Sequence, residues 1–150
     1  MDFFDSLAVV PAGFGPSAVT VGKFDGVHTG HRAVLARLRE VAADRGLASV
    51  VVTFDRNPLS VLNPAVCPAP LVSNAQKREL LEETGIDAAL MLAFDRELSQ
   101  TDPGDFVRRV LLEALGARAV LAGSDFRFGR RGAGDTALLA EPLQRFTRML

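Results

Sequence analysis

The chain has 150 residues, 48% hydrophobic and 23% charged, a composition typical of a single globular domain with a substantial core. Its 17 basic residues balance 18 acidic ones for a net charge of −1, which argues against electrostatic binding to nucleic acid or to an anionic membrane surface. One cysteine excludes an intrachain disulfide and a thiolate metal cluster, and no signal peptide or apolar run of about 18 residues is evident, so a cytoplasmic protein is expected.

Four strands and four helices are predicted to alternate along the chain. Strands are expected at Ala18–Gly22, Ala48–Phe54, Ala88–Leu92 and Ala119–Ala122. Helices are expected from Thr29 to Asp44, from Ser73 to Gly85, from Asp102-Pro103 to Gly116, and over the spacing of Leu139, Leu143, Phe146 and Leu150. Residues 1–17 are expected to be an irregular lead-in that covers one edge, and residues 55–72 a proline-rich loop. This alternation predicts a parallel α/β sheet, with the loops after the first, second and fourth strands at one end.

The segment from Val19 to His31 joins the first strand to the first helix through a glycine-bearing turn. His28 and His31 are three residues apart, so they would share one face of the helix start, and Gly30 between them lets a ligand approach the backbone. The free N–H groups and positive dipole end of such a helix form an anion site. The spacing fits two interpretations equally: a polyphosphate site with two imidazoles, and a pair of surface histidines beside an ordinary turn between strand and helix.

Three segments carry a more specific resemblance. They are Gly22-Lys-Phe-Asp-Gly-Val-His-Thr-Gly-His31, Thr53-Phe-Asp-Arg-Asn-Pro58, and Gly123-Ser-Asp-Phe-Arg-Phe-Gly129 followed by Gly134-Asp135. In order and spacing they resemble motifs of the FMN adenylyltransferase module of bacterial bifunctional FAD synthetases (riboflavin kinase/FMN adenylyltransferase), which belong to the His-x-Gly-His nucleotidylyltransferase superfamily. The resemblance runs from about residue 17 to the end of the chain.

The resemblance implies an enzyme of FAD biosynthesis that transfers AMP from ATP to FMN with Mg²⁺, giving FAD and pyrophosphate. By matching position, His28 and His31 would be the catalytic contacts of the ATP phosphates. The ATP-binding set would comprise these two histidines with Gly22, Lys23, Phe24, Asp25, Gly26, Gly30 and Asp125. The flavin-binding set would comprise Asn57, Pro58, Arg127 and Phe128. Mg²⁺ is expected on the ATP phosphates, with no protein side chain assigned as its ligand.

The chain also departs from the family's pattern. Arg56-Asn57 replaces a frequent Pro-His, and Leu62 stands where an aromatic side chain would suit a flavin. The family's second phosphate motif and its riboflavin kinase domain are not found before Leu150, so one truncated domain over 1–150 is expected. The fold would be a Rossmann-like sheet of strand order 3-2-1-4 with the family's fifth strand missing. The Ala119–Ala122 strand would then be an exposed edge, which predicts self-association or lowered stability.

Two further functions fit the same residues. One is a His-x-Gly-His nucleotidylyltransferase with another acceptor, such as phosphopantetheine, nicotinate mononucleotide or a phospho-alcohol. The other is a non-catalytic module that binds ATP or a flavin without turnover. A redox flavoprotein fits less well, because the glycine loop lacks a Gly-x-Gly-x-x-Gly pattern. The expected partners are therefore the small molecules ATP and FMN, with neither nucleic acid nor membrane.

Overall fold

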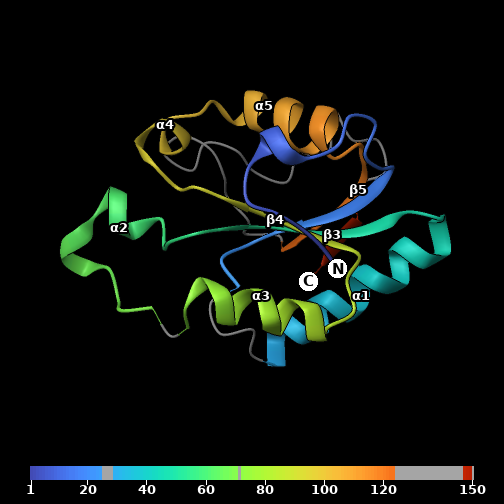
Figure 1. Ribbon diagram of the computed structural model, residues 1–150, viewed down its shortest axis with the longest axis horizontal. Helices are drawn as coiled ribbons and strands as arrows, with labels where there is room; N and C mark the ends of the chain where they lie inside the picture. The colour runs from blue at the N-terminus through green and yellow to red at the C-terminus, as the bar shows by residue number, and fades with distance from the viewer. Residues whose placement is uncertain (25–28, 71, 124–146, 150) are drawn as a thin grey trace.

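The computed structural model describes residues 1–24, 29–70, 72–123 and 147–149. Within these ranges six parallel strands form one sheet in the order β1-β4-β3-β2-β5-β6 (Figure 1). The strands are β1 (Asp2–Phe4), β2 (Ser17–Val21), β3 (Ala48–Phe54), β4 (Ala88–Leu92), β5 (Ala117–Gly123) and β6 (Thr147–Met149).

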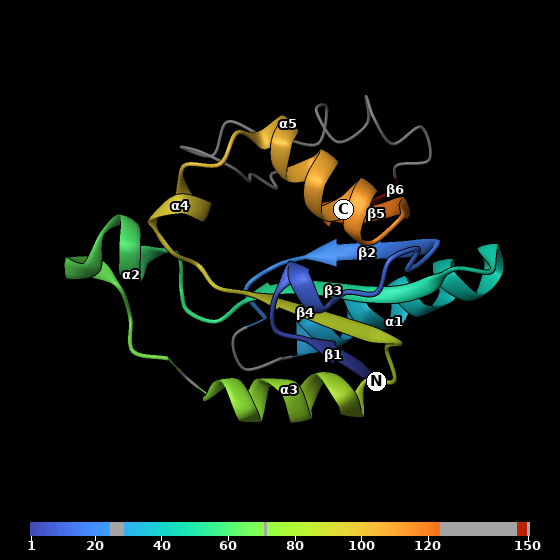
Figure 2. The same cartoon turned by 45° about the horizontal axis from the view of Figure 1, so that its top comes forward.

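Helices cover both faces of this sheet. They are α1 (Thr29–Arg45), α2 (Leu59–Leu62), α3 (Asn74–Glu83), α4 (Arg96–Ser99) and α5 (Pro103–Phe106), which continues as the π-helical η3 (Val107–Ala114); η1 (Leu7–Val9) and η2 (Pro64–Val66) are short 3₁₀ turns. Figure 2 shows α1 and α3 on one side of the sheet and α5 on the other. No helix among the described ranges is long and apolar enough to cross a membrane.

The predicted α/β class is confirmed. The four strands expected from the sequence lie side by side as β4-β3-β2-β5. From β2 the chain moves outward to β3 and β4, and then returns to place β5 on the other side of β2. Because the direction of winding reverses there, the carboxyl ends of β2 and β5 flank the switch point where ligands bind in open parallel sheets.

Two edge strands differ from the prediction. The lead-in contains β1, which pairs with β4, so it covers the edge as a strand rather than as an irregular segment. A short strand that was not expected, β6, pairs with β5 from Leu121 to Gly123. This pairing contradicts the helix expected at 147–149, and it covers the end but not the start of the Ala119–Ala122 edge on which the predicted self-association rested. Strands of three residues carry too little alternation to detect, and the helical spacing of Leu143, Phe146 and Leu150 masked β6.

Alternate residues of the strands β1 to β5 contribute to two hydrophobic clusters, one on each face of the sheet. Val50 and Val52 pack in the cluster under α5 and η3, whereas Val51 between them packs under α1 and α3, and all three are fully buried. The unbroken valine run therefore marks a strand covered on both faces, as expected for a parallel sheet. The helices contribute their apolar stripes, with Leu35 and Leu38 on one face and Val107, Val110, Leu111 and Leu115 on the other.

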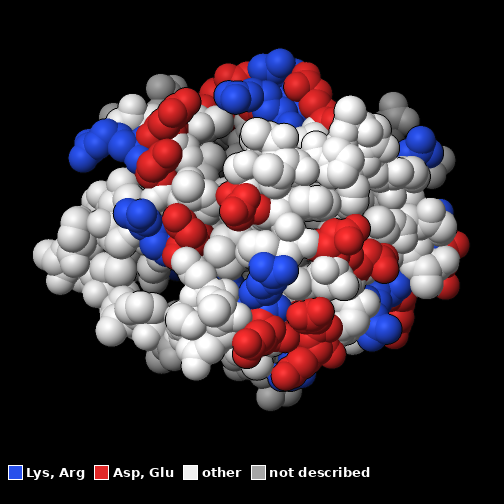
Figure 3. Space-filling view, viewed as in Figure 1, with Lys and Arg blue, Asp and Glu red and all other residues white. Residues whose placement is uncertain are grey.

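Charged side chains are intermixed on the face of the molecule in Figure 3, where blue and red groups alternate without a continuous field of one sign. The uncharged surface on its left lies over the α2 region, where Leu62 and Val66 are both exposed. This distribution agrees with the near-neutral balance of the whole sequence.

Candidate active site

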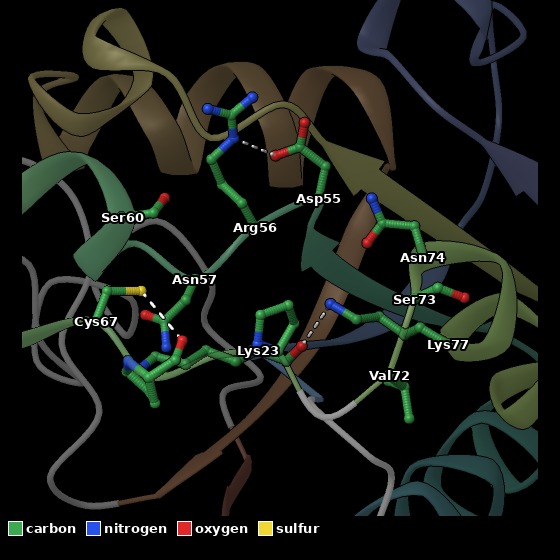
Figure 4. Close-up of a pocket in the computed structure, with 12 residues that line it drawn as sticks. Lys23, Asp55, Arg56, Asn57, Ser60, Cys67, Val72, Ser73, Asn74 and Lys77 are labelled. Atoms are coloured by element: carbon green, nitrogen blue, oxygen red, sulfur yellow. Dashed lines mark hydrogen bonds and ion pairs between the residues drawn. The ribbon is translucent and has the colours of Figure 1, made fainter. Parts of the chain in front are cut away.

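A cavity of about 460 Å³ opens at the carboxyl ends of β2 and β3 (Figure 4). Its walls are formed by Lys23 after β2, by the loop that follows β3, and by the start of α3. The lining residues are Lys23, Asp55, Arg56, Asn57, Ser60, Cys67, Pro68, Pro70, Val72, Ser73, Asn74 and Lys77. A cavity at this end of a parallel sheet, and of this size, has the position and dimensions of a small-molecule site.

The segment 22–31 is here named the glycine loop, and its described residues are 22–24 and 29–31. The Gly22 N–H donates to Val52 O at 3.0 Å. Phe24 then adopts a φ of +49° and buries its ring, whose centroid lies 5.0 Å from that of His31. A Cβ on Gly22 would come within 2.9 Å of the Phe24 ring, so this turn requires glycine. Phe24, which the sequence analysis placed beside the nucleotide, packs in the core and lies against His31 in the first turn of α1.

A buried lysine ties this loop to the next one. The Nζ of Lys77 donates to Phe54 O at 2.8 Å and to Lys23 O at 3.0 Å, and Lys77 is only 6% exposed. The Thr53 hydroxyl donates to the same Lys23 carbonyl at 2.9 Å. Figure 4 shows the Lys77 ammonium directed at that carbonyl from the α3 side of the cavity.

The segment 55–72, here named the proline loop, is held by its own polar groups. The Asp55 carboxylate accepts from Phe94 N–H at 2.9 Å and faces the Arg56 guanidinium at 3.5 Å. The Asn57 side-chain oxygen accepts from Leu59 N–H at 3.0 Å and thereby shapes the entry to α2. The Ser60 hydroxyl is buried at the cavity wall and has no hydrogen-bond partner among the residues that the structure describes.

Several sequence-predicted site residues meet at this place. Lys23 from the ATP-binding set and Asn57 from the flavin-binding set line the same cavity. Gly22, Gly30 and His31 lie between the end of β2 and the first turn of α1, and Pro58 starts α2 outside the cavity lining. Asp25, Gly26, His28, Asp125, Arg127 and Phe128 lie outside the described residues.

Comparison with known proteins decides the family. The profile of the FAD synthetase family matches residues 12–148. The chain belongs to the FAD synthetase family.

Relatives in this family are similar over most of the chain. A bifunctional riboflavin kinase/FMN adenylyltransferase of Pseudomonas fluorescens is 42% identical over 116 residues, which is 77% of this chain and 37% of the relative. The protein of the same name from Escherichia coli K12 is 37% identical over 81% of this chain and 39% of its own length, and that of Haemophilus influenzae 33% over 86% and 42%. The chain therefore spans about two fifths of the length of these relatives.

A solved structure shares the fold. The crystal structure described as a macrolide-efflux protein from Streptococcus pneumoniae superposes with a TM-score of 0.83 over 98% of this chain and 48% of that chain. Its sequence is 21% identical, and at this level the similarity shows the fold alone.

Lys77 and Thr53 hold the Lys23 carbonyl beside this cavity, and the sequence analysis assigned a role to neither, although Thr53 begins the second of the three motif segments. Lys77 lies in a run of polar residues at the start of α3, which is typical of an exposed helix face. The burial of Lys77 could have been predicted from helical spacing. Lys77 is four residues before Leu81 and therefore lies on the same, buried face of the helix. A lysine in phase with a core leucine indicates an ammonium that meets buried acceptors.

The described part of the site offers no dedicated metal cage. Among these residues no three His, Cys, Asp or Glu side chains gather to hold a metal ion. The cavity lining carries the basic side chains of Lys23, Arg56 and Lys77 together with one carboxylate, that of Asp55.

Proposed function

We propose that this chain transfers the adenylyl group of ATP to FMN, forming FAD and pyrophosphate. The observation that carries the proposal is the shared cavity, which Lys23 of the glycine loop and Asn57 of the proline loop both line, together with the start of α3. Membership in the FAD synthetase family and the names of the relatives support the same chemistry. The unpartnered Ser60 hydroxyl at the wall fits a ligand with polar ring atoms.

In the proposed reaction an FMN phosphate oxygen attacks the α-phosphorus of ATP in line. A phosphorus–oxygen bond to FMN forms as the bond between the α-phosphorus and its bridging oxygen breaks, and pyrophosphate leaves. Positioning and charge neutralisation supply most of the catalysis in such transfers. His31, the N–H groups that begin α1, and the Lys23 ammonium would stabilise the phosphates. Mg²⁺ on the phosphates would add charge neutralisation.

The remaining residue roles are proposals on the same basis. His28 would act with His31 on the ATP phosphates, while Gly22, Phe24, Asp25, Gly26, Gly30 and Asp125 would shape the nucleotide side. Asn57, Pro58, Arg127 and Phe128 would form the flavin side. We assign residues 1–150 to one adenylyltransferase domain and do not assign to it the kinase activity in the relatives' names. A cytoplasmic location is part of the proposal, supported by the single cysteine.

The deciding experiment is an assay of FAD and pyrophosphate formation from ATP and FMN. We expect FAD with FMN and Mg²⁺, and loss of turnover when EDTA removes the metal. Parallel reactions contain phosphopantetheine, nicotinate mononucleotide or a phospho-alcohol in place of FMN. Product with one of these acceptors and none with FMN would assign another transferase, and bound flavin without pyrophosphate release would indicate a non-catalytic binding module.

A further inference from the structure

The buried Lys77 ammonium lies where the glycine loop and the proline loop leave the sheet. Burial of a charge is unfavourable unless acceptors surround it, and the carbonyls of Lys23 and Phe54 serve here at 3.0 and 2.8 Å. A leucine would fill the same helix position, in phase with Leu81, at no electrostatic cost. The lysine therefore contributes something that packing does not require.

On the glycine-loop side, the Lys23 carbonyl lies in the peptide that enters Phe24. Two donors hold this carbonyl, the Lys77 ammonium and the Thr53 hydroxyl at 2.9 Å. The next residue has the positive φ of +49° that turns the Phe24 ring under His31. Rotation of the held peptide would move the ring, and with it the imidazole that the ring supports.

On the proline-loop side, the Phe54 carbonyl lies in the peptide that enters Asp55. Asp55 is itself fixed to the end of β4 through Phe94 N–H. Asn57 follows two residues later and faces the cavity. One ammonium thus holds a peptide near the start of each loop, and the two loops carry the residues proposed for the two substrates.

We propose that Lys77 is a positioning residue that holds the glycine loop and the proline loop in the mutual arrangement that adenylyl transfer requires. It acts through two backbone carbonyls and not through contact with a substrate. This inference rests on the proposed function. The two hydrogen bonds from the Lys77 ammonium to the Lys23 and Phe54 carbonyls are here named the clamp. Loss of the clamp would lower the rate of adenylyl transfer more than it would weaken the binding of either substrate.

The first test compares steady-state FAD formation in Lys77→Met, Lys77→Arg and the wild type. We expect Lys77→Met to lower kcat by about 10- to 100-fold, the range in which misplacement of reacting groups falls, with KM for ATP and FMN changed by only a few-fold. Lys77→Arg keeps the charge and donors and should recover part of the rate. Asp87→Ala is the control, because it destabilises the opposite end of the same sheet, where Asp87 contacts Ser49.

A second test detects the structural effect of the Lys77 hydrogen bonds by NMR and does not depend on enzymatic activity. The chain has two histidines, so the His31 imidazole resonances can be assigned by proton NMR with a His31→Gln variant. Phe24 lies 5.0 Å from this ring and shifts these resonances. We expect Lys77→Met to move them toward free-histidine values and Thr53→Val to move them less in the same direction. If Lys77→Met does not fold, Thr53→Val carries both tests.

Three results would overturn the inference. They are an unchanged kcat with a raised KM in Lys77→Met, which would make Lys77 a direct substrate contact; an equal loss of kcat in Asp87→Ala, which would make its role general stability; and unmoved His31 resonances in Lys77→Met. A wild type that makes no FAD would refute the proposed function instead, and the NMR comparison would still decide whether the clamp exists.

Discussion

The polar side chains at the two ends of the sheet have different surroundings: those at the amino end bond to one another, whereas those at the carboxyl end lie beside a cavity. At the amino end, Asp87 accepts from both the N–H and the hydroxyl of Ser49 at 2.8 and 3.1 Å, and the Asp87 N–H donates back to the Ser49 hydroxyl at 2.9 Å. The Ser17 hydroxyl there donates to Leu115 O at 2.7 Å. At the carboxyl end, Lys77 holds two carbonyls beside a cavity that Lys23 and Asn57 also line.

We therefore expect the amino end of the sheet to contribute mainly to stability and the carboxyl end mainly to ligand binding. Side chains at the amino end satisfy one another and leave little for a ligand. The carboxyl end collects cationic groups, and the parallel topology directs the positive N-terminal ends of α1 and α3 toward it. Substitutions at the carboxyl end should therefore change turnover, whereas those at the amino end should change the free energy of unfolding.

The largest expected effect is at the carboxyl end. His31→Ala should lower kcat for FAD formation by about 100- to 1,000-fold, the scale for removal of one preorganised charge-stabilising group. Its half-buried side chain should matter less to folding, which thermal unfolding of the same protein would check. Arg37→Ala, an exposed change further along α1, is the matched control and should keep the wild-type rate. An unchanged rate in His31→Ala would remove this residue from the catalytic set.

The next effect is at the amino end. Asp87→Ala should lower the free energy of unfolding by about 1–3 kcal/mol, because it leaves the N–H and hydroxyl of buried Ser49 without their acceptor. Urea denaturation measures this change, and kcat should stay at the wild-type value. A large loss of kcat with intact stability would contradict the division between the two ends.

A smaller effect is expected at the helix that carries Lys77. Ser73 and Gln76 form a reciprocal capping box at the start of α3, with bonds of 3.1 and 2.8 Å. Ser73→Ala should lower the free energy of unfolding by about 1 kcal/mol through the lost cap. Ser73→Asp, which keeps an acceptor at the N-cap, should retain most of that stability in the same urea titration. Equal losses in both variants would show that the cap is not the cause.

Local signals predicted most of the inner fold. The run of valines predicted β3, and Ser73 with Gln76 predicted the start of α3. Gly46, predicted to end α1, has the positive φ of +66° that such a position favours. Each of these is decided within a few residues of sequence. The family resemblance supplied the order of the four inner strands, which the sheet has, and it named the family that the profile match confirms.

Features that depend on distant residues were not predicted. The β6 strand forms because three residues pair with the edge of β5, and no pattern within Thr147–Met149 itself predicts a strand. The burial of the Phe24 ring was not predicted either, because it follows from a positive φ and from packing against distant residues of the core. Lys77 was overlooked because its two acceptors are 54 and 23 residues away in sequence.

The position of β2 between β3 and β5 has a consequence for synthesis of the chain. The Thr20 hydroxyl donates to Leu121 O across 101 residues, so β2 has its second neighbour only after that much further chain has been made. At ribosomal speed this takes about 5–20 s, during which one edge of β2 offers unpaired N–H and C=O groups to other chains. The β2–β5 junction at the switch point is thus the last junction among the four inner strands that synthesis of the chain allows to form.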